Sequence, residues 1–143
     1  MSLSWRALVM LAWALFVVTL TTQSDDVPVV HLVIGLIGQT ELGATAGHAG
    51  LFGLLALVIY AALAVKLPGR LALPPAIGLA LALGTITEFY QKLVAGRTAS
   101  LSDLLANWLG VFVVAFVIAY WLAGSSLRQN WKPKPGENFA VVV

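Results

Sequence analysis

The chain contains four long runs of apolar residues, each close to the length that crosses a membrane as a helix. They cover residues 5–20, 49–65, 71–89 and 104–123. A transmembrane helix needs about 20 mainly apolar residues, within a usual range of about 17–25. Charged residues make up only 10% of the 143 residues, whereas soluble domains carry about 25%. The sequence therefore predicts an all-α integral membrane protein, a four-helix bundle, and excludes a soluble enzyme and a disordered chain.

A shorter apolar segment lies between the first two runs, at residues 27–38. Twelve residues are too few to cross a bilayer, so we expect an interfacial or re-entrant helix here. Arg6 near the start of the first run would also suit a signal peptide. Because residues 21–24 read Thr-Thr-Gln-Ser rather than a small-residue cleavage site, we expect a retained span.

The basic residues are distributed unevenly over the predicted loops. If both termini are cytoplasmic, the outer side holds only Lys92 and Arg97, and the inner side holds Arg6, Lys66, Arg70, Arg128, Lys132 and Lys134. The positive-inside rule favours this orientation. We therefore predict a multi-pass cell-membrane protein, with a membrane domain at residues 1–127 and a basic cytoplasmic tail at residues 128–143. Gly124-Ser125-Ser126 is expected to end the fourth span.

Polar side chains gather where the third run ends and the fourth begins. Glu88 and Gln91 are three residues apart, and Asp103, Asn107 and Gly110 follow the i, i+4, i+7 pattern of one helix face. Adjacent antiparallel helices would bring these faces together near the outer boundary. Polar groups at membrane depth are costly and therefore candidates for function. The expected constellation comprises His48, Glu88, Gln91, Arg97, Asp103 and Asn107. His48 and Glu88 are the candidate acid–base residues, and the other four are candidate binding residues.

Each of these residues also has a structural interpretation. Ser100-x-x-Asp103 before an apolar run is a capping-box pattern. Arg97 could neutralise a nearby carboxylate or bind a lipid phosphate. Asn107 could serve only to link helices through hydrogen bonds, and His48 could be an ordinary interfacial polar residue.

Several kinds of site are not indicated. The sequence has no cysteine, no phosphate-binding loop, no H-E-x-x-H helix and no G-x-S-x-G elbow. No metal-ligand spacing is present, so no metal and no cofactor are predicted. With a net charge of +2 from 8 basic and 6 acidic residues, binding to nucleic acid is not expected.

The polar block resembles a motif of the VanZ-like family. Residues 87–91 read TEFYQ and residues 96–110 read GRTASLSDLLANWLG, which is similar to the family pattern E-x-x-Q, G-R-x-x-S-x-x-D and N-x-x-G. GHAGLF at residues 47–52 is similar to the family's histidine at the start of the second span. The likeness covers residues 48 to about 120. It implies a small bacterial membrane protein, and the family's namesake is linked to teicoplanin resistance, although no reaction is assigned to the family.

Two functions follow as hypotheses. In the first, a polar pocket at the outer membrane face binds a lipid or another cell-envelope component, and whether it also catalyses a reaction stays open. In the second, the chain is a non-enzymatic accessory subunit that binds other membrane subunits, and the polar block is a latch between helices. A small transporter or channel is a weaker hypothesis, because the other spans have almost no polar residues at mid-depth.

Overall fold

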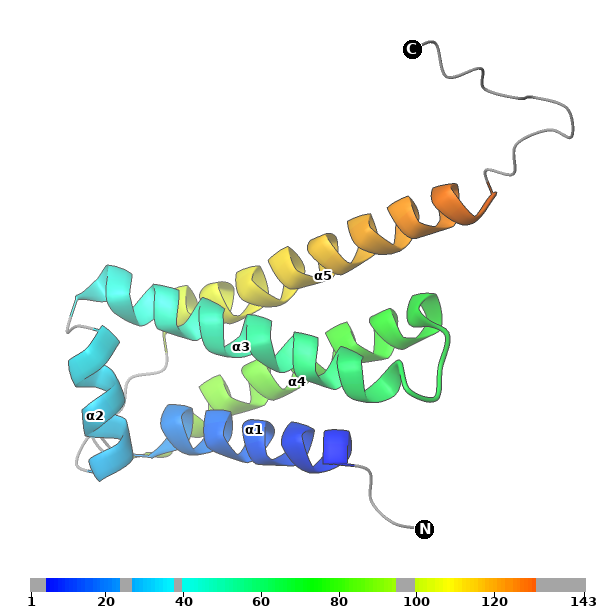
Figure 1. The fold of residues 1–143 in the computed structure, drawn as a ribbon. Coiled ribbons are helices and arrows are strands. Elements are labelled where there is room, and N and C mark those ends of the chain that lie inside the picture. Colours follow the sequence, from blue (N-terminus) through cyan, green and yellow to red (C-terminus); the bar gives the residue numbers. More distant parts are fainter. Residues whose placement is uncertain (1–4, 24–26, 38–39, 95–99, 131–143) are drawn as a thin grey trace, which may run out of the picture.

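A computed structural model describes residues 5–23, 27–37, 40–94 and 100–130. In these ranges the chain forms five helices and no strands (Figure 1): α1 (Trp5–Thr22), α2 (Pro28–Ile37), α3 (Glu41–Leu63), α4 (Gly69–Gln91) and α5 (Leu101–Asn130). All except α2 are long and apolar enough to cross a membrane. The predicted all-α four-helix bundle is confirmed, and so is a short helix between the first two long ones.

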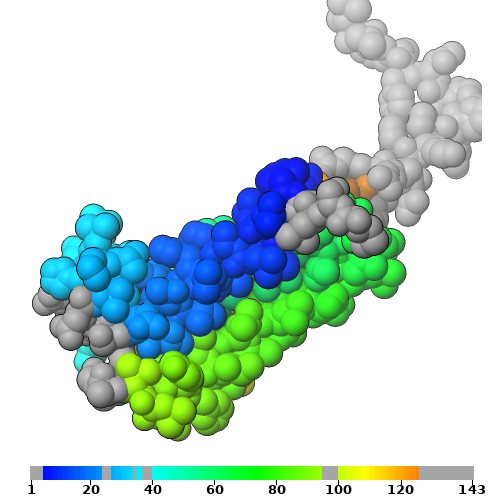
Figure 2. Space-filling view, turned by 90° about the horizontal axis from the view of Figure 1, so that it is seen from below, coloured from blue at the N-terminus to red at the C-terminus, as the bar shows by residue number. Residues whose placement is uncertain are grey.

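Helix α3 is the centre of the bundle, because it contacts each of the other four helices. Helix α1 packs on α3 and α4 and lies alongside α4 in Figure 2. Its residues Val17 and Leu20 are buried. The first apolar run is therefore an integral part of the bundle.

A stripe of small residues runs along α4 and allows the neighbouring helices to approach closely. Ala72, Ala76, Ala80 and Gly84 follow one another at intervals of four, and all are buried. Small residues at this spacing are typical of helix interfaces in membranes. The stripe packs into a core formed by Val17, Phe52, Leu55, Ala56, Ile59 and Val111.

The closest approach joins α3 to α5 at Gly110. A Cβ atom on this glycine would lie 1.9 Å from the carbonyl oxygen of Ala49, far inside any van der Waals contact. Gly53 faces the same crossing, since a Cβ placed there would meet the Gly110 carbonyl oxygen at 3.0 Å. The two glycines therefore allow the backbones of α3 and α5 to approach closely.

Two helix ends differ from the predicted ones. Helix α3 begins at Glu41, eight residues before the predicted start at residue 49, because the Thr40 hydroxyl accepts a 3.0 Å hydrogen bond from the amide of Gly43 and caps the helix. The apolar part of the fourth span reaches Ser125, within the residues 124–126 predicted to end it, but helix α5 itself continues to Asn130. The Ser125 hydroxyl donates to the Leu122 carbonyl at 2.8 Å and so stays within the helical turn. Most of the predicted tail, residues 131–143, lies outside the described residues.

Helix α2 lies across one end of the bundle rather than along it (Figure 1). It contacts α1 and α3 and buries Val30 while exposing Leu32 and Leu36. We call this end of the bundle the α2 end. It contains the last turns of α1 and α4 and the first turns of α3 and α5, which carry the polar residues.

Candidate functional site

Three polar side chains from three helices meet inside the α2 end. His48 of α3 places Nδ1 3.0 Å from Oδ1 of Asn107 on α5 and 3.8 Å from Oε1 of Glu88 on α4. Asn107 Nδ2 donates to Glu88 Oε1 at 3.3 Å. We call these residues the polar network. The expected meeting of the helix faces is observed for these three.

Glu88 and Asn107 are buried and His48 is half-buried, because these residues continue the packing stripes of their helices. Glu88 follows Gly84 at the same interval of four that separates the small residues of α4, and it is only 5% exposed. His48 precedes the core residue Phe52 by four positions, and Asn107, which is 1% exposed, precedes the core residue Val111 by four. The helical period alone therefore directs all three polar side chains toward the interior.

One oxygen of Glu88 is left open. Asn107 and His48 both approach Oε1, and the Ser100 backbone at the start of α5 also hydrogen-bonds the carboxyl group, whereas Oε2 is buried and has no close donor of its own within the described part of the chain. The carboxyl group of Asp103 is close enough to act on Glu88 electrostatically and repels rather than neutralises it. A buried polar oxygen without a partner is costly. A ligand would therefore gain the most binding free energy in this site by donating a hydrogen bond to Glu88 Oε2.

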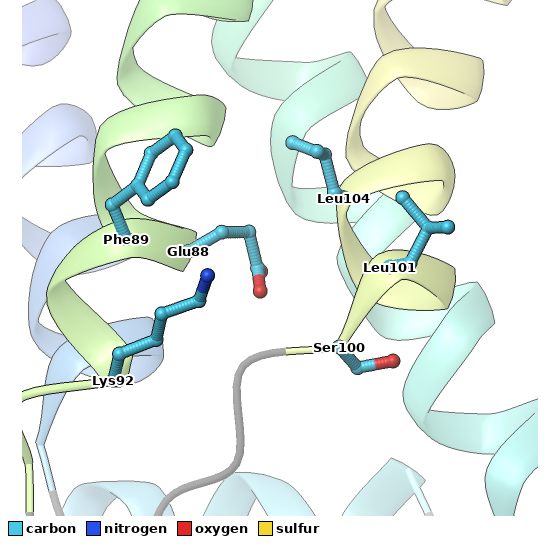
Figure 3. A pocket seen from close by; sticks show the side chains of 6 residues that line it. All are labelled: Glu88, Phe89, Lys92, Ser100, Leu101 and Leu104. Carbon is cyan, nitrogen blue, oxygen red and sulfur yellow. The ribbon is translucent and has the colours of Figure 1, made fainter.

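Glu88 also forms part of the wall of a small pocket between α4 and α5 (Figure 3). The pocket has a volume of about 150 Å³ and is lined by Glu88, Phe89, Lys92, Ser100, Leu101 and Leu104. In Figure 3 the Glu88 carboxyl group points between the two helices, and the Lys92 ammonium group lies on the same side. Lys92 Nζ is 5.0 Å from the centre of the Phe89 ring, a cation–π distance. The pocket thus joins an acidic group, a basic group and an apolar wall.

Gln91 turns away from the polar network. Its Nε2 donates to the backbone carbonyl of Thr21 on α1 at 2.6 Å, and its side chain is buried. A step of three residues rotates a helical position by about 60° from the starting direction, which is enough to face a different neighbour at the end of α4. Gln91 therefore ties α4 to α1, while Glu88 ties α4 to α3 and α5.

Ser100 begins α5 as half of the predicted capping box. Its hydroxyl accepts from the amide of Ser102 at 3.1 Å, and its carbonyl accepts from the amide of Leu104 at 3.1 Å. The amide that donates to the hydroxyl is that of Ser102 rather than that of Asp103. The capping hydrogen bond therefore spans two residues instead of the three that the pattern predicts. It fixes the start of α5 beside the pocket.

The six predicted site residues divide into three groups. His48, Glu88 and Asn107 are brought together with Asp103 nearby, Gln91 contacts α1 instead, and Arg97 lies outside the described residues. Their roles in binding or catalysis stay predictions.

The sequence interpretation did not include Lys92 and Phe89 in the site. The signal was available for Lys92, which follows Glu88 by four residues and so shares its face of the helix.

Among the described residues, no group of three or more histidine, aspartate or glutamate side chains could hold a metal ion.

No protein-family model matches the chain, and neither a curated protein nor a solved structure matches it.

Proposed function

We propose that this chain is a small VanZ-like membrane protein whose pocket between α4 and α5 binds a membrane lipid or another amphiphilic component of the cell envelope. The observation that carries the proposal is Glu88 Oε2, a buried oxygen without a hydrogen-bond donor in the wall of a pocket that also has apolar sides. An amphiphile supplies both a polar head for that oxygen and an apolar chain for the rest of the wall.

The residues divide the work of binding. Phe89, Leu101 and Leu104 would contact an apolar chain, and Lys92 and Ser100 would contact polar atoms of the ligand. His48 and Asn107 hold the Glu88 carboxyl group in place through Oε1. If a proton is transferred to or from the ligand, Glu88 is the group in reach and His48 is its neighbour.

The proposed location of the pocket rests on the distribution of basic residues over the loops. With both termini cytoplasmic, as the loop charges favour, the α2 end lies at the outer face of a cell membrane. Arg97, which follows α4 in the sequence, is proposed to pair with an anionic group of the ligand. An outward pocket is the arrangement suited to an envelope component.

The experiment fills the pocket and measures what co-purifies. Leu104→Trp places a large side chain on the pocket wall, whereas Leu105→Trp adds the same bulk at a neighbouring exposed position outside it. Native mass spectrometry of each protein, purified in mild detergent with a total lipid extract, counts the lipids that stay bound. We expect loss of bound lipid in Leu104→Trp only. Equal retention in both variants would contradict the proposal.

A second function is supported by the way the polar residues join helices. The network links α3, α4 and α5, and Gln91 links α4 to α1, so the polar block also serves as a latch that would suit an accessory subunit of a larger membrane complex. Gentle detergent purification separates the two functions. Stable stoichiometric partner subunits would favour the latch, and a single chain with bound lipid would favour the pocket.

A further inference from the structure

The pocket carries two polar positions of opposite charge, which lie on the same side of α4 (Figure 3). Glu88 offers an oxygen, and Lys92 offers an ammonium group. The two side chains are one helical turn apart, about 5–6 Å between Cβ atoms. Within the described residues no ion pair joins them, since the ion pair of Glu88 there is with His48. Each position is therefore available to a ligand that carries the complementary group.

The acceptor position is narrow and directional. Oε1 of Glu88 is taken by Asn107 and His48, so the carboxyl group cannot rotate freely, and Oε2 is left as a fixed acceptor. Asp103 adds a second carboxyl group nearby. A primary ammonium group fits this position because it donates hydrogen bonds, is small and is positively charged. A quaternary ammonium group has no N–H to donate to Oε2.

The donor position is suited to a phosphate group. Lys92 presents three N–H donors and is held over the Phe89 ring at 5.0 Å. Ser100 and Leu101 on the opposite wall are at the beginning of α5, a helix of 30 residues whose N-terminus favours negative charge. Lys92 and the N-terminus of α5 therefore both border the pocket, beside Glu88 Oε2.

We infer that the pocket binds the zwitterionic headgroup of an aminophospholipid of the ethanolamine kind, with its primary ammonium group on Glu88 Oε2 and its phosphate group between Lys92 and the start of α5. The acyl chains lie along Phe89, Leu101 and Leu104. This inference rests on the proposed function and names the ligand class of the same pocket.

The test compares lipids that differ only in the headgroup. The full-length protein in mild detergent is titrated with phosphatidylethanolamine, phosphatidylcholine and phosphatidylglycerol of identical acyl chains, and bound lipid is measured by native mass spectrometry. We expect phosphatidylethanolamine to bind about tenfold more tightly than either of the others, the ratio that one charge-assisted hydrogen bond supplies. This comparison needs no variant and so does not depend on how a variant folds.

Two substitutions locate the headgroup within the pocket. Glu88→Gln keeps the shape of the side chain and should remove the preference for phosphatidylethanolamine over phosphatidylcholine. Lys92→Met keeps the length of the stem and should weaken both phosphate-bearing zwitterions equally. Lys66→Met is the matched control, because Lys66 is exposed in the α3–α4 turn, outside the pocket. A preference that survives Glu88→Gln in folded protein would overturn the inference.

The outcomes separate this inference from the proposed function. If all three lipids bind equally and Leu104→Trp abolishes binding, the headgroup assignment fails and the pocket function stands. If the wild-type protein retains no lipid at all, both fail. If soluble glycerophosphoethanolamine displaces the lipid at equal concentration, the acyl chains contribute nothing, and the assignment to a membrane lipid is overturned.

Discussion

The middle of the bundle and its α2 end use the same helix faces in different ways. In the middle, the α4 face carries Ala72, Ala76 and Ala80, which are buried against close neighbours. At the α2 end the same face carries Glu88, which is joined to its neighbours by polar contacts and lies beside a pocket. Small side chains remove the space between helices, whereas longer polar ones hold the helices through directed bonds and leave space. The site therefore arises where a polar side chain replaces the small ones on the same packing face of α4.

Overpacking the closely packed middle of the bundle should cause the greatest loss of stability. In Gly110→Ala the new Cβ would lie 1.9 Å from the Ala49 carbonyl oxygen, a backbone atom that cannot move alone. We expect a loss of stability of at least about 3 kcal/mol, the upper part of the usual range for overpacking, measured by thermal unfolding in detergent. Gly124→Ala on the same helix is the control, because a Cβ there meets nothing within 4 Å. A wild-type melting temperature for Gly110→Ala would refute the crossing.

A change in the polar network should have the next largest effect. Asn107→Leu leaves His48 and Glu88 Oε1 without their amide partner, and an unsatisfied buried polar group costs about 1–3 kcal/mol. Denaturant titration in mixed micelles measures this loss.

A double-mutant cycle sharpens that measurement. His48→Ala and Asn107→Ala should couple by about 0.6 kcal/mol and by at most about 1.7 kcal/mol, the range for hydrogen bonds between membrane helices. Strictly additive effects would mean that the 3.0 Å contact between these side chains contributes nothing.

Gln91 distinguishes the latch from the pocket at the same end of the bundle. Gln91→Leu removes the bond to the Thr21 carbonyl and should cost about 1 kcal/mol, a typical hydrogen-bond contribution, while lipid binding stays unchanged because Gln91 does not line the pocket. Unfolding and native mass spectrometry of the same sample test both parts. Tyr90→Leu, at the exposed neighbouring position, is the control. Lost lipid binding in stable Gln91→Leu protein would place Gln91 in the binding site instead.

An exposed hydrogen bond outside the polar network should contribute least to stability. Trp108 Nε1 donates to Thr85 Oγ1 at 3.3 Å in an exposed position. Trp108→Phe should therefore lower stability by only about 0.5 kcal/mol, the lower end for a hydrogen bond. Trp121→Phe makes the same change at another exposed site on α5. A larger loss for Trp108 than for Asn107 would reverse the order of importance proposed for buried and exposed bonds.

Much of the fold could be predicted because apolar length and turn residues are local properties. The four long helices follow from the four apolar runs, and the short helix follows from a run too short to cross. The helix ends were less predictable. A single hydroxyl, that of Thr40, caps α3 about two turns before its predicted start. Gly124 and the two serines after it do not stop α5, because glycine and serine in a helix interior cost about 1 kcal/mol or less and do not break the helix as proline does.

The site was predictable where helical spacing decides and not where three-dimensional direction decides. Spacing brought His48, Glu88 and Asn107 together. It could not show that Gln91 faces α1, because that depends on where α1 lies beside α4. Nor could it show which Glu88 oxygen stays open, because that depends on how two other side chains share the first oxygen.

The length of α5 has a consequence for how the protein sits in a bilayer. Its apolar part, Leu101–Ser125, has 25 residues and measures about 38 Å at about 1.5 Å per residue, against a hydrocarbon thickness of about 30 Å. The helix must lean or thicken the lipid around it, and in Figure 1 its far half diverges from the other helices. The pocket lies at the N-terminal end of α5. A change in bilayer thickness would therefore tilt this helix and alter the width of the pocket opening.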